Sequence, residues 1–216
     1  MLWSMLEEKL RNKIAPPSNG LSGDIYGLQF GSILKEKNIK TVVLCLDVSK
    51  DVIIKANKLN AQLIISHHGM THNALKYIND ELLDRIKLLS QYNISLWVMH
   101  TAWDAAPGGI SEIYTRMAGL QVIDNFYFDD HGNNKPIGRI GRPISKELGI
   151  DEITTLEDII KNLQRNLKLQ YIKYYGELSQ TVEKAAICGG KGLNKTKILE
   201  ALKQECDTYI AGEINY

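Results

Sequence analysis

The sequence predicts an α/β protein whose strands form a largely parallel, buried sheet. Short runs of β-branched and apolar residues alternate with segments in which apolar residues recur at helical spacing. This alternation is typical of βαβ units. The chain has 216 residues, of which 44% are hydrophobic, so it can build substantial cores. The second half repeats the alternation more loosely, and we expect two α/β lobes, 1–122 and 123–216.

The first half predicts three strands and three helices. Ser49 is a suitable N-cap for the first helix, and Asn79 or Asp80 begins the second. Gly119 ends the third helix. The strands are expected at 41–46, 61–66 and 94–99, and the helices at 51–59, 78–92 and 110–118.

The second half predicts further strands and helices around a polar turn region at 129–136. A glycine- and arginine-rich stretch, 137–144, follows this turn region. Thr155 and Asp158 have the spacing of a capping box, which marks the start of a helix. The strands are expected at 123–128, 170–175, 184–188 and 208–211, and the helices at 155–167 and 194–204.

Composition restricts the partners and the compartment. The net charge is only +1, which argues against nucleic acid as the main partner. No apolar run approaches the ~20 residues that span a bilayer, and charged residues at 7–9 interrupt any secretory core. The three cysteines are widely separated and odd in number, which fits neither a disulfide framework nor a cysteine zinc site. Cys45 is expected as a buried, reduced thiol in a cytoplasmic protein.

Chemically capable residues follow each strand of the first half. Asp47 follows the first strand, His67 and His68 follow the second, and His100 begins a stretch that reaches Asp104 after the third. In open parallel sheets ligands bind at the carboxyl ends of the strands. Taken singly, Asp47 is equally explained as a helix cap and His100 as a structural residue. Together the strand ends predict a site.

The adjacent histidines predict a metal site. Where a strand ends the backbone turns, so the imidazoles of His67 and His68 can diverge toward two neighbouring ions. Two histidines need a carboxylate, and Asp104 lies 36 residues after His68. One aspartate can bridge two metals about 3.5–4 Å apart. His72 and His131 are interpreted as surface-loop residues.

Glycine-rich turns offer a second, weaker signal. The segment 189–192, Gly-Gly-Lys-Gly, joins a strand to a helix and is either a tight turn or a phosphate-binding loop. It lacks the spacing of a Walker loop. Gly108 and Gly109 are expected to shape another helix N-terminus. The tyrosines at 171, 174 and 175 are interpreted as sheet and interface residues.

Read together, these motifs resemble the Nif-three-like dinuclear metal proteins, whose members carry the name GTP cyclohydrolase 1 type 2 homologue. The Ser-His-His end of 63–68 resembles the family's double-histidine motif. The sequence Asp-Ala-Ala-Pro-Gly-Gly at 104–109 resembles its bridging-aspartate motif. Further matching segments are 14–17, 27–31, 186–192 and 207–213.

The resemblance implies two related α/β lobes in a toroidal hexamer with metal sites facing an internal cavity. His67, His68 and Asp104 would hold two divalent ions (zinc, iron, nickel or manganese), with Asp104 as the bridge. The C-terminal strand would return toward this site, and the family pattern continues past Tyr216 to a histidine and a glutamate that complete the metal shell. Gly69 replaces the proline that usually follows the double histidine, which predicts a more mobile loop.

Three functions are compatible with this sequence. The first is metal-dependent hydrolysis of a small polar or nucleotide-like substrate, in which the metals acidify a bridging water; Asp47 or His100 would then be candidate proton donors. The alternative is a non-enzymatic metal-binding scaffold or regulator that acts through protein partners. A nucleic-acid-binding ring is the third, and near-zero net charge disfavours it.

Overall fold

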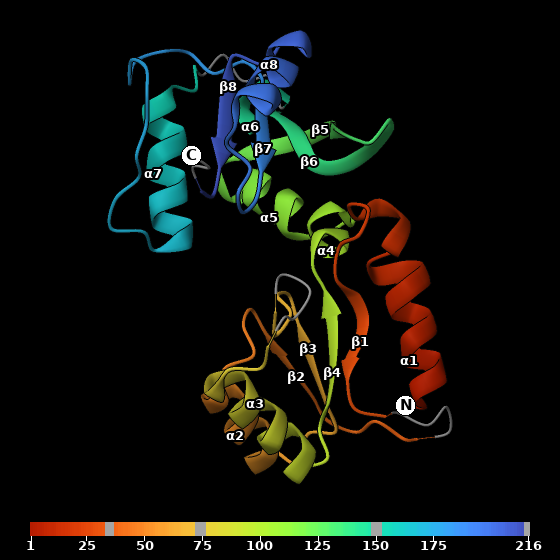
Figure 1. The fold of residues 1–216 in the computed structure, drawn as a ribbon. Helices are drawn as coiled ribbons and strands as arrows, with labels where there is room; N and C mark the ends of the chain where they lie inside the picture. Colours follow the sequence, from red (N-terminus) through yellow and green to blue (C-terminus); the bar gives the residue numbers. More distant parts are fainter. Residues whose placement is uncertain (33–36, 72–76, 148–152, 214–216) are drawn as a thin grey trace. The chain divides into compact units, whose positions relative to one another are not determined.

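A computed structural model describes residues 1–32, 37–71, 77–147 and 153–213 (Figure 1). Contacts divide the chain into two compact units, Met1–Trp103 and Asp104–Tyr216. Each unit contains one four-stranded sheet of mixed direction covered by helices. The predicted α/β class is therefore confirmed. The lobe boundary expected between residues 122 and 123 stays a prediction.

The first sheet has the strand order β1-β4-β3-β2. Its three parallel strands are β2 (Val42–Cys45), β3 (Leu63–Ser66) and β4 (Ser95–Met99), as the apolar runs predict. The sequence pattern did not predict β1 (Tyr26–Phe30), which pairs with β4 in the antiparallel direction. β3 and β4 occupy the centre and are buried along their whole length.

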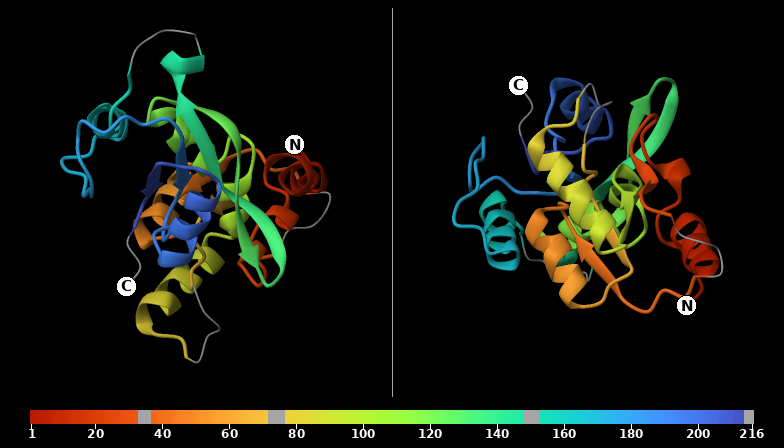
Figure 2. Two further views of the ribbon diagram at one scale, coloured as in Figure 1. Left: turned by 90° about the horizontal axis from the view of Figure 1, so that it is seen from above. Right: turned by 60° about the horizontal axis from the view of Figure 1, so that its bottom comes forward.

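Helices cover both faces of this sheet. Helices α2 (Lys50–Lys58) and α3 (Asp80–Gln91) lie next to each other, and Figure 2 shows the pair from two sides. They begin at Ser49 and Asn79, whose side chains accept hydrogen bonds from backbone amides in the first turn. Helix α1 (Trp3–Lys9) continues into a π-helix, Leu10–Ile14, and a 3₁₀ turn follows at Pro17–Asn19.

The two faces of the sheet have separate cores. Ile64, Leu96 and Val98 belong to the cluster that packs with α2 and α3. Trp97 points the other way and packs edge-to-face against Trp3 of α1, with ring centroids 5.2 Å apart. A sheet buried on both faces is rigid, and rigid strands fix the residues that follow them.

The second sheet has the strand order β5-β6-β7-β8. β5 (Leu120–Asp130) and β6 (Asn133–Pro143) form a long hairpin. β7 (Ala185–Cys188) pairs with β6 in the antiparallel direction and with β8 (Thr208–Ala211) in parallel. The helices of this unit are α5 (Ile110–Met117), α6 (Ile144–Glu147), α7 (Leu156–Leu167) and α8 (Lys195–Lys203). The short α4 (Thr101–Ala105) follows β4.

Two expectations about the second half are wrong. The region 129–136 is not an extended polar turn, because it lies mostly within the β5–β6 hairpin, and only His131 and Gly132 make the turn. The region 170–175 is not a strand. Its tyrosines are exposed instead of paired in a sheet, and Tyr175 is fully exposed.

The local helix signals of the second half are confirmed. Thr155 and Asp158 form a reciprocal capping box at the start of α7, and Asn194 caps α8. Ile159 and Leu163 of α7 pack into a core with Leu120, Ala185 and Ile187 of the sheet. Among the described residues, no helix is both long and apolar enough to cross a membrane.

Candidate metal centre

His67 and His68 sit where the central strand β3 ends. The backbone continues the parallel pairing beyond the strands, since the amides of His67 and His68 donate to the carbonyls of Cys45 and Leu46 at 3.0 and 2.9 Å. Ser66, which is 1% exposed, donates its hydroxyl to the Leu46 carbonyl at 3.0 Å. These bonds fix both histidines at the carboxyl end of the sheet, where parallel sheets bind ligands.

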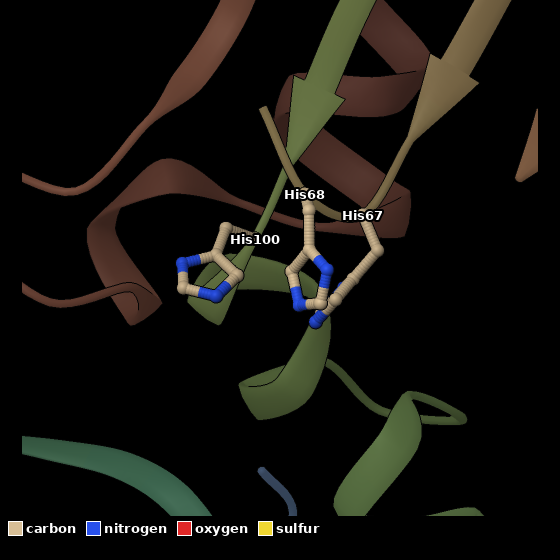
Figure 3. Close-up of side chains that lie close together, drawn as sticks. All are labelled: His67, His68 and His100. Carbon is tan, nitrogen blue, oxygen red and sulfur yellow. The ribbon is translucent and has the colours of Figure 1, made fainter. Parts of the chain in front are cut away.

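His100 joins the pair from the neighbouring strand. It follows β4 directly, and its ring centroid lies 5.1 Å from that of His67 and 5.5 Å from that of His68. One ligand nitrogen from each of the three rings lies within 4.8 Å of the other two. Figure 3 shows the three side chains gathered at the ends of the two strands. The sequence-predicted meeting of these strand ends is thus confirmed for the histidines.

The environment of His67 keeps its imidazole neutral. Burial, together with the neighbouring His100 and His68 rings, lowers the pKa of His67 to about 4. The Met99 backbone and Asp24 oppose this shift. At neutral pH His67 therefore carries a lone pair on a ring nitrogen, which is the form that binds metals.

Carboxylates hold the other two rings. Asp47 Oδ1 lies 2.8 Å from His68 Nδ1, and Asp24 Oδ1 lies 2.7 Å from His100 Nδ1. Burial alone would raise the pKa of Asp24, but hydrogen bonds from His100 and Thr101 lower this pKa to about 2. Asp24 is therefore ionised. Both carboxylates contact the Nδ1 side of a ring, so a metal ion would be bound through Nε2.

Asp104 lies in α4, four residues after His100. The division between the two units falls between Trp103 and Asp104, so the grouping of Asp104 with His67 and His68 stays a prediction. Within the second unit, the charge of Asp104 contributes, after burial, to raising the pKa of the Cys188 thiol at the end of β7 to about 11, and Lys197 opposes the shift.

Sequence reasoning missed Arg139, which supports the segment after Asp104. Its side chain is buried in β6, with the residue only 3% exposed. Nη2 donates to the carbonyls of Ala105 and Ala106 at 2.7 and 2.9 Å, and Nη1 donates to those of Pro136 and Gly138 at 3.0 and 2.8 Å. The glycine- and arginine-rich composition of 137–144 does not indicate this role, because the hydrogen bond from Arg139 to Ala105 joins residues more than 30 positions apart.

A second missed residue is Gln29 of β1, which supports the loop after the double histidine. Its Oε1 accepts a hydrogen bond from the Met70 amide at 2.8 Å. A Cβ at Gly69 would come within 2.8 Å of Gln29 Nε2, so glycine allows a close approach here. The expected greater mobility of this loop stays a prediction.

The remaining candidates that the structure describes lie in the second unit. His131 is exposed in the hairpin turn with φ of 53°, as expected of a loop residue. His72 lies outside the described residues. The glycine segment 189–192 forms a tight turn between β7 and α8, in which the Gly190 carbonyl accepts hydrogen bonds from Gly192 and Glu213. Gly109 precedes α5 at its N-cap, as predicted.

The chemistry of the cluster fits a divalent metal ion. Imidazole nitrogen is a preferred donor for zinc, iron and nickel, and three such nitrogens form the ligand set of many catalytic zinc sites. Carboxylates behind two of the rings match the usual support of metal-binding histidines.

Comparison with known proteins decides the family. The profile of the Duf34/NIF3 family (NGG1p interacting factor 3) matches residues 4–216. The chain belongs to the Duf34/NIF3 family. The resemblance inferred from the double histidine and the Asp-Ala-Ala-Pro-Gly-Gly motif is thereby confirmed.

Individual Duf34/NIF3 proteins are similar over most of this chain. The GTP cyclohydrolase 1 type 2 homolog of Clostridium perfringens is 28% identical over 211 residues, covering 94% of this chain and 74% of its own length. The NGG1-interacting factor 3 of Saccharomyces cerevisiae is 29% identical over 195 residues, covering 84% of this chain and 65% of its own.

Solved structures share the fold. Staphylococcus aureus protein SA1388 superposes with a TM-score of 0.79 at 22% identity, covering all of this chain and 80% of its own. A Bacillus cereus protein related to NIF3 gives a TM-score of 0.77 at 18% identity, covering 99% of this chain and 83% of its own. At these identities the likeness establishes the fold alone.

Proposed function

We propose that this protein holds two divalent metal ions through His67, His68 and Asp104 and hydrolyses a small polar or nucleotide-like substrate. The observation that supports metal binding is the cluster of His67, His68 and His100, whose ligand nitrogens lie within 4.8 Å of one another. Asp104 is proposed as the bridging carboxylate because it is an acidic residue on the short helix that His100 precedes.

The residues of this chain would have different roles at such a site. His67, held neutral by burial, and His68, backed by Asp47, present ring nitrogens to the metal. A divalent ion held here supplies Lewis acidity toward a carbonyl or phosphoryl oxygen of the substrate. Asp47 or His100, beside the pair, is the proposed proton donor, and Asp47 takes this role if His100 is itself a metal ligand.

Names of relatives support the proposal to different degrees. The clostridial relative carries a cyclohydrolase name, which favours hydrolysis of a nucleotide-like molecule. The yeast relative is named for an interacting partner, which favours the alternative of a metal-binding scaffold that acts through proteins. Fold and family name do not decide between them, because one fold hosts many activities.

The proposal extends to assembly and compartment. We propose a toroidal hexamer, and support comes from the edge strand β2, where Leu44 and the adjoining Leu46 are 75% and 60% exposed. An exposed apolar edge strand can pair with another chain, which supports an oligomer, and the hexameric number comes from the family resemblance. The three free cysteines agree with a reducing cytoplasm. Analytical ultracentrifugation tests the hexamer, which a monomeric or dimeric mass would contradict.

The function is tested by turnover that follows metal content. Protein stripped with a chelator and reloaded with Zn²⁺, Mn²⁺, Fe²⁺ or Ni²⁺ is assayed on a panel of nucleoside phosphates. We expect activity only after reloading, a loss of at least about 100-fold in His67→Ala, and no change in the exposed control His131→Ala. Metal binding without turnover on any nucleotide would favour the scaffold. Equal turnover in stripped and reloaded protein would contradict the hydrolase.

A further inference from the structure

The loop before β1 brings an aspartate to His100 from 76 residues away. Asp24 and His100 both lie in the first unit, and Asp24 Oδ1 lies 2.7 Å from His100 Nδ1. The side chain of Asp24 is only 18% exposed, so the contact is shielded from water more than a surface ion pair. Nothing in the sequence pattern marks Asp24, because no metal motif includes it.

The hydrogen bonds of Asp24 fix its direction. Oδ1 accepts the Ile25 amide at 2.8 Å, and Oδ2 accepts the Thr101 amide at 2.9 Å. The Thr101 hydroxyl also donates to Oδ2, and its own oxygen accepts the Leu21 amide at 2.9 Å. Backbone amides can only donate, so both oxygens of Asp24 face donors.

This network determines which nitrogen of His100 carries the proton. The ionised carboxylate of Asp24 has no hydrogen to donate, so it can only accept from His100. His100 Nδ1 therefore carries a hydrogen and donates it to Asp24. A neutral imidazole then has its lone pair on Nε2. His100 Nδ1 is turned toward Asp24, and in Figure 3 the other ring nitrogen lies nearer to His67 and His68 than Nδ1 does.

We propose that Asp24 is a positioning residue that fixes His100 as the Nδ1–H tautomer, so that His100 Nε2 serves the metal centre as a ligand nitrogen beside His67 and His68. This inference rests on the proposed metal site and adds to it the residue that prepares His100. Asp24 also accepts the first amide of α4, the helix that carries Asp104. One side chain therefore orders both the ring and the start of that helix.

The close approach of the Asp24 loop depends on Gly20. A Cβ at Gly20 would come within 3.1 Å of the Ala102 amide nitrogen and of Thr101 Oγ1. The loop thus lies tightly against the first turn of α4, which limits the movement of Asp24 away from His100.

The test uses Asp24→Asn with Asp84→Asn as a matched control. Asparagine offers one acceptor oxygen where Asp24 offers two, so its amide nitrogen must face either Thr101 or His100. When it faces His100, the ring must accept at Nδ1 and place its proton on Nε2. Asp84→Asn removes the same charge from an exposed pair with Lys50 and leaves the histidines untouched.

Two readouts are measured on the full chain. ¹⁵N NMR of histidine-labelled metal-free protein, assigned with His100→Gln, is expected to show Nδ1–H at His100 in the wild type and an increased Nε2–H population in Asp24→Asn. Affinity for Co²⁺, measured by competition with a chelator, is expected to fall 10- to 100-fold in Asp24→Asn and to stay unchanged in Asp84→Asn.

The outcomes separate this proposal from the proposed function. Wild-type His100 in the Nε2–H form, or an Asp24→Asn protein with wild-type tautomer and affinity, would overturn the role of Asp24. If Asp24→Asn does not fold, the wild-type tautomer alone decides. If the wild-type protein binds no Co²⁺, the proposed metal function fails, and the ligand role of His100 Nε2 fails with it. A loss of Co²⁺ affinity in Asp24→Asn but not in Asp84→Asn supports both the metal function and the role of Asp24.

Discussion

Replacing Arg139 with methionine removes the buried guanidinium that supports the segment after Asp104. Arg139 donates to four backbone carbonyls, at 2.7 to 3.0 Å. The Ala106 carbonyl keeps the Gly109 amide as a donor in the variant, whereas the carbonyls of Ala105, Pro136 and Gly138 each lose the Arg139 donor. Unsatisfied buried carbonyls cost about 1–3 kcal/mol each, and part of this is recovered because no charge is buried. We expect destabilisation of about 3–5 kcal/mol.

Urea unfolding can locate this loss in the second unit. The three tryptophans, Trp3, Trp97 and Trp103, all lie in the first unit, so their fluorescence reports on it, whereas circular dichroism reports on both units. With a urea dependence of about 2 kcal/mol per M, the second-unit transition of Arg139→Met should fall by about 2 M.

Two variants control this experiment. Arg142→Met makes the same change at an exposed position of the same strand, and we expect a shift below about 0.5 kcal/mol. Arg139→Lys keeps the charge but not the planar fork of donors, so its loss should be intermediate. Equal midpoints for Arg139→Met and Arg142→Met would refute the supporting role of Arg139.

Further predictions concern packing, thiols and metal stoichiometry. Gly138→Ala places a Cβ 2.6 Å from the Ile187 carbonyl oxygen and should lower the free energy of unfolding by about 3 kcal/mol, as measured by thermal unfolding. The control Gly132→Ala, where only the positive φ is unfavourable, should lower it by about 1 kcal/mol. An equal cost at both glycines would contradict this packing. Because burial raises the pKa of Cys188 to about 11, a thiol reagent at pH 8 should modify the half-buried Cys45 first and Cys188 only after denaturation; rapid modification of native Cys188 would be inconsistent with its burial. Asp104→Ala should lower bound metal from two ions per chain to one or fewer, and two ions at full occupancy would exclude a bridging Asp104.

Local signals in the sequence were sufficient for most helices and central strands. Ser49, Asn79, Asn194 and the Thr155–Asp158 capping box each act within three residues, so their effect can be recognised without the fold. The apolar runs of β2, β3 and β4 predict strands because a sheet covered on both faces needs them.

The errors arise where tertiary contacts override propensity. β6 contains glycines that disfavour strands, yet Gly138 is required because Phe126 and the Ile187 carbonyl occupy the space of a Cβ. The region 170–175 is rich in strand-forming residues but has no strand pairing in the structure. β propensity expresses packing against neighbours, and neighbours are not visible in a single sequence.

The candidate site shows the same division. His67, His68, His100 and Asp47 follow apolar strands, so their meeting could be predicted from the rule that parallel strands end at one edge. Asp24 and Arg139 could not be predicted, because each acts over a contact between distant segments. They support the site through other residues, and no sequence motif with a recognisable spacing includes them.

Metal content per chain tests the central claim most directly. Protein purified without chelator is analysed by mass spectrometry, alongside His67→Ala, His68→Ala and the exposed control His131→Ala. We expect bound divalent metal in the wild type and in His131→Ala, and a clear loss in each cluster variant. Metal-free wild-type protein that also takes up none on addition, or equal metal in all four proteins, would contradict a metal centre built on His67 and His68.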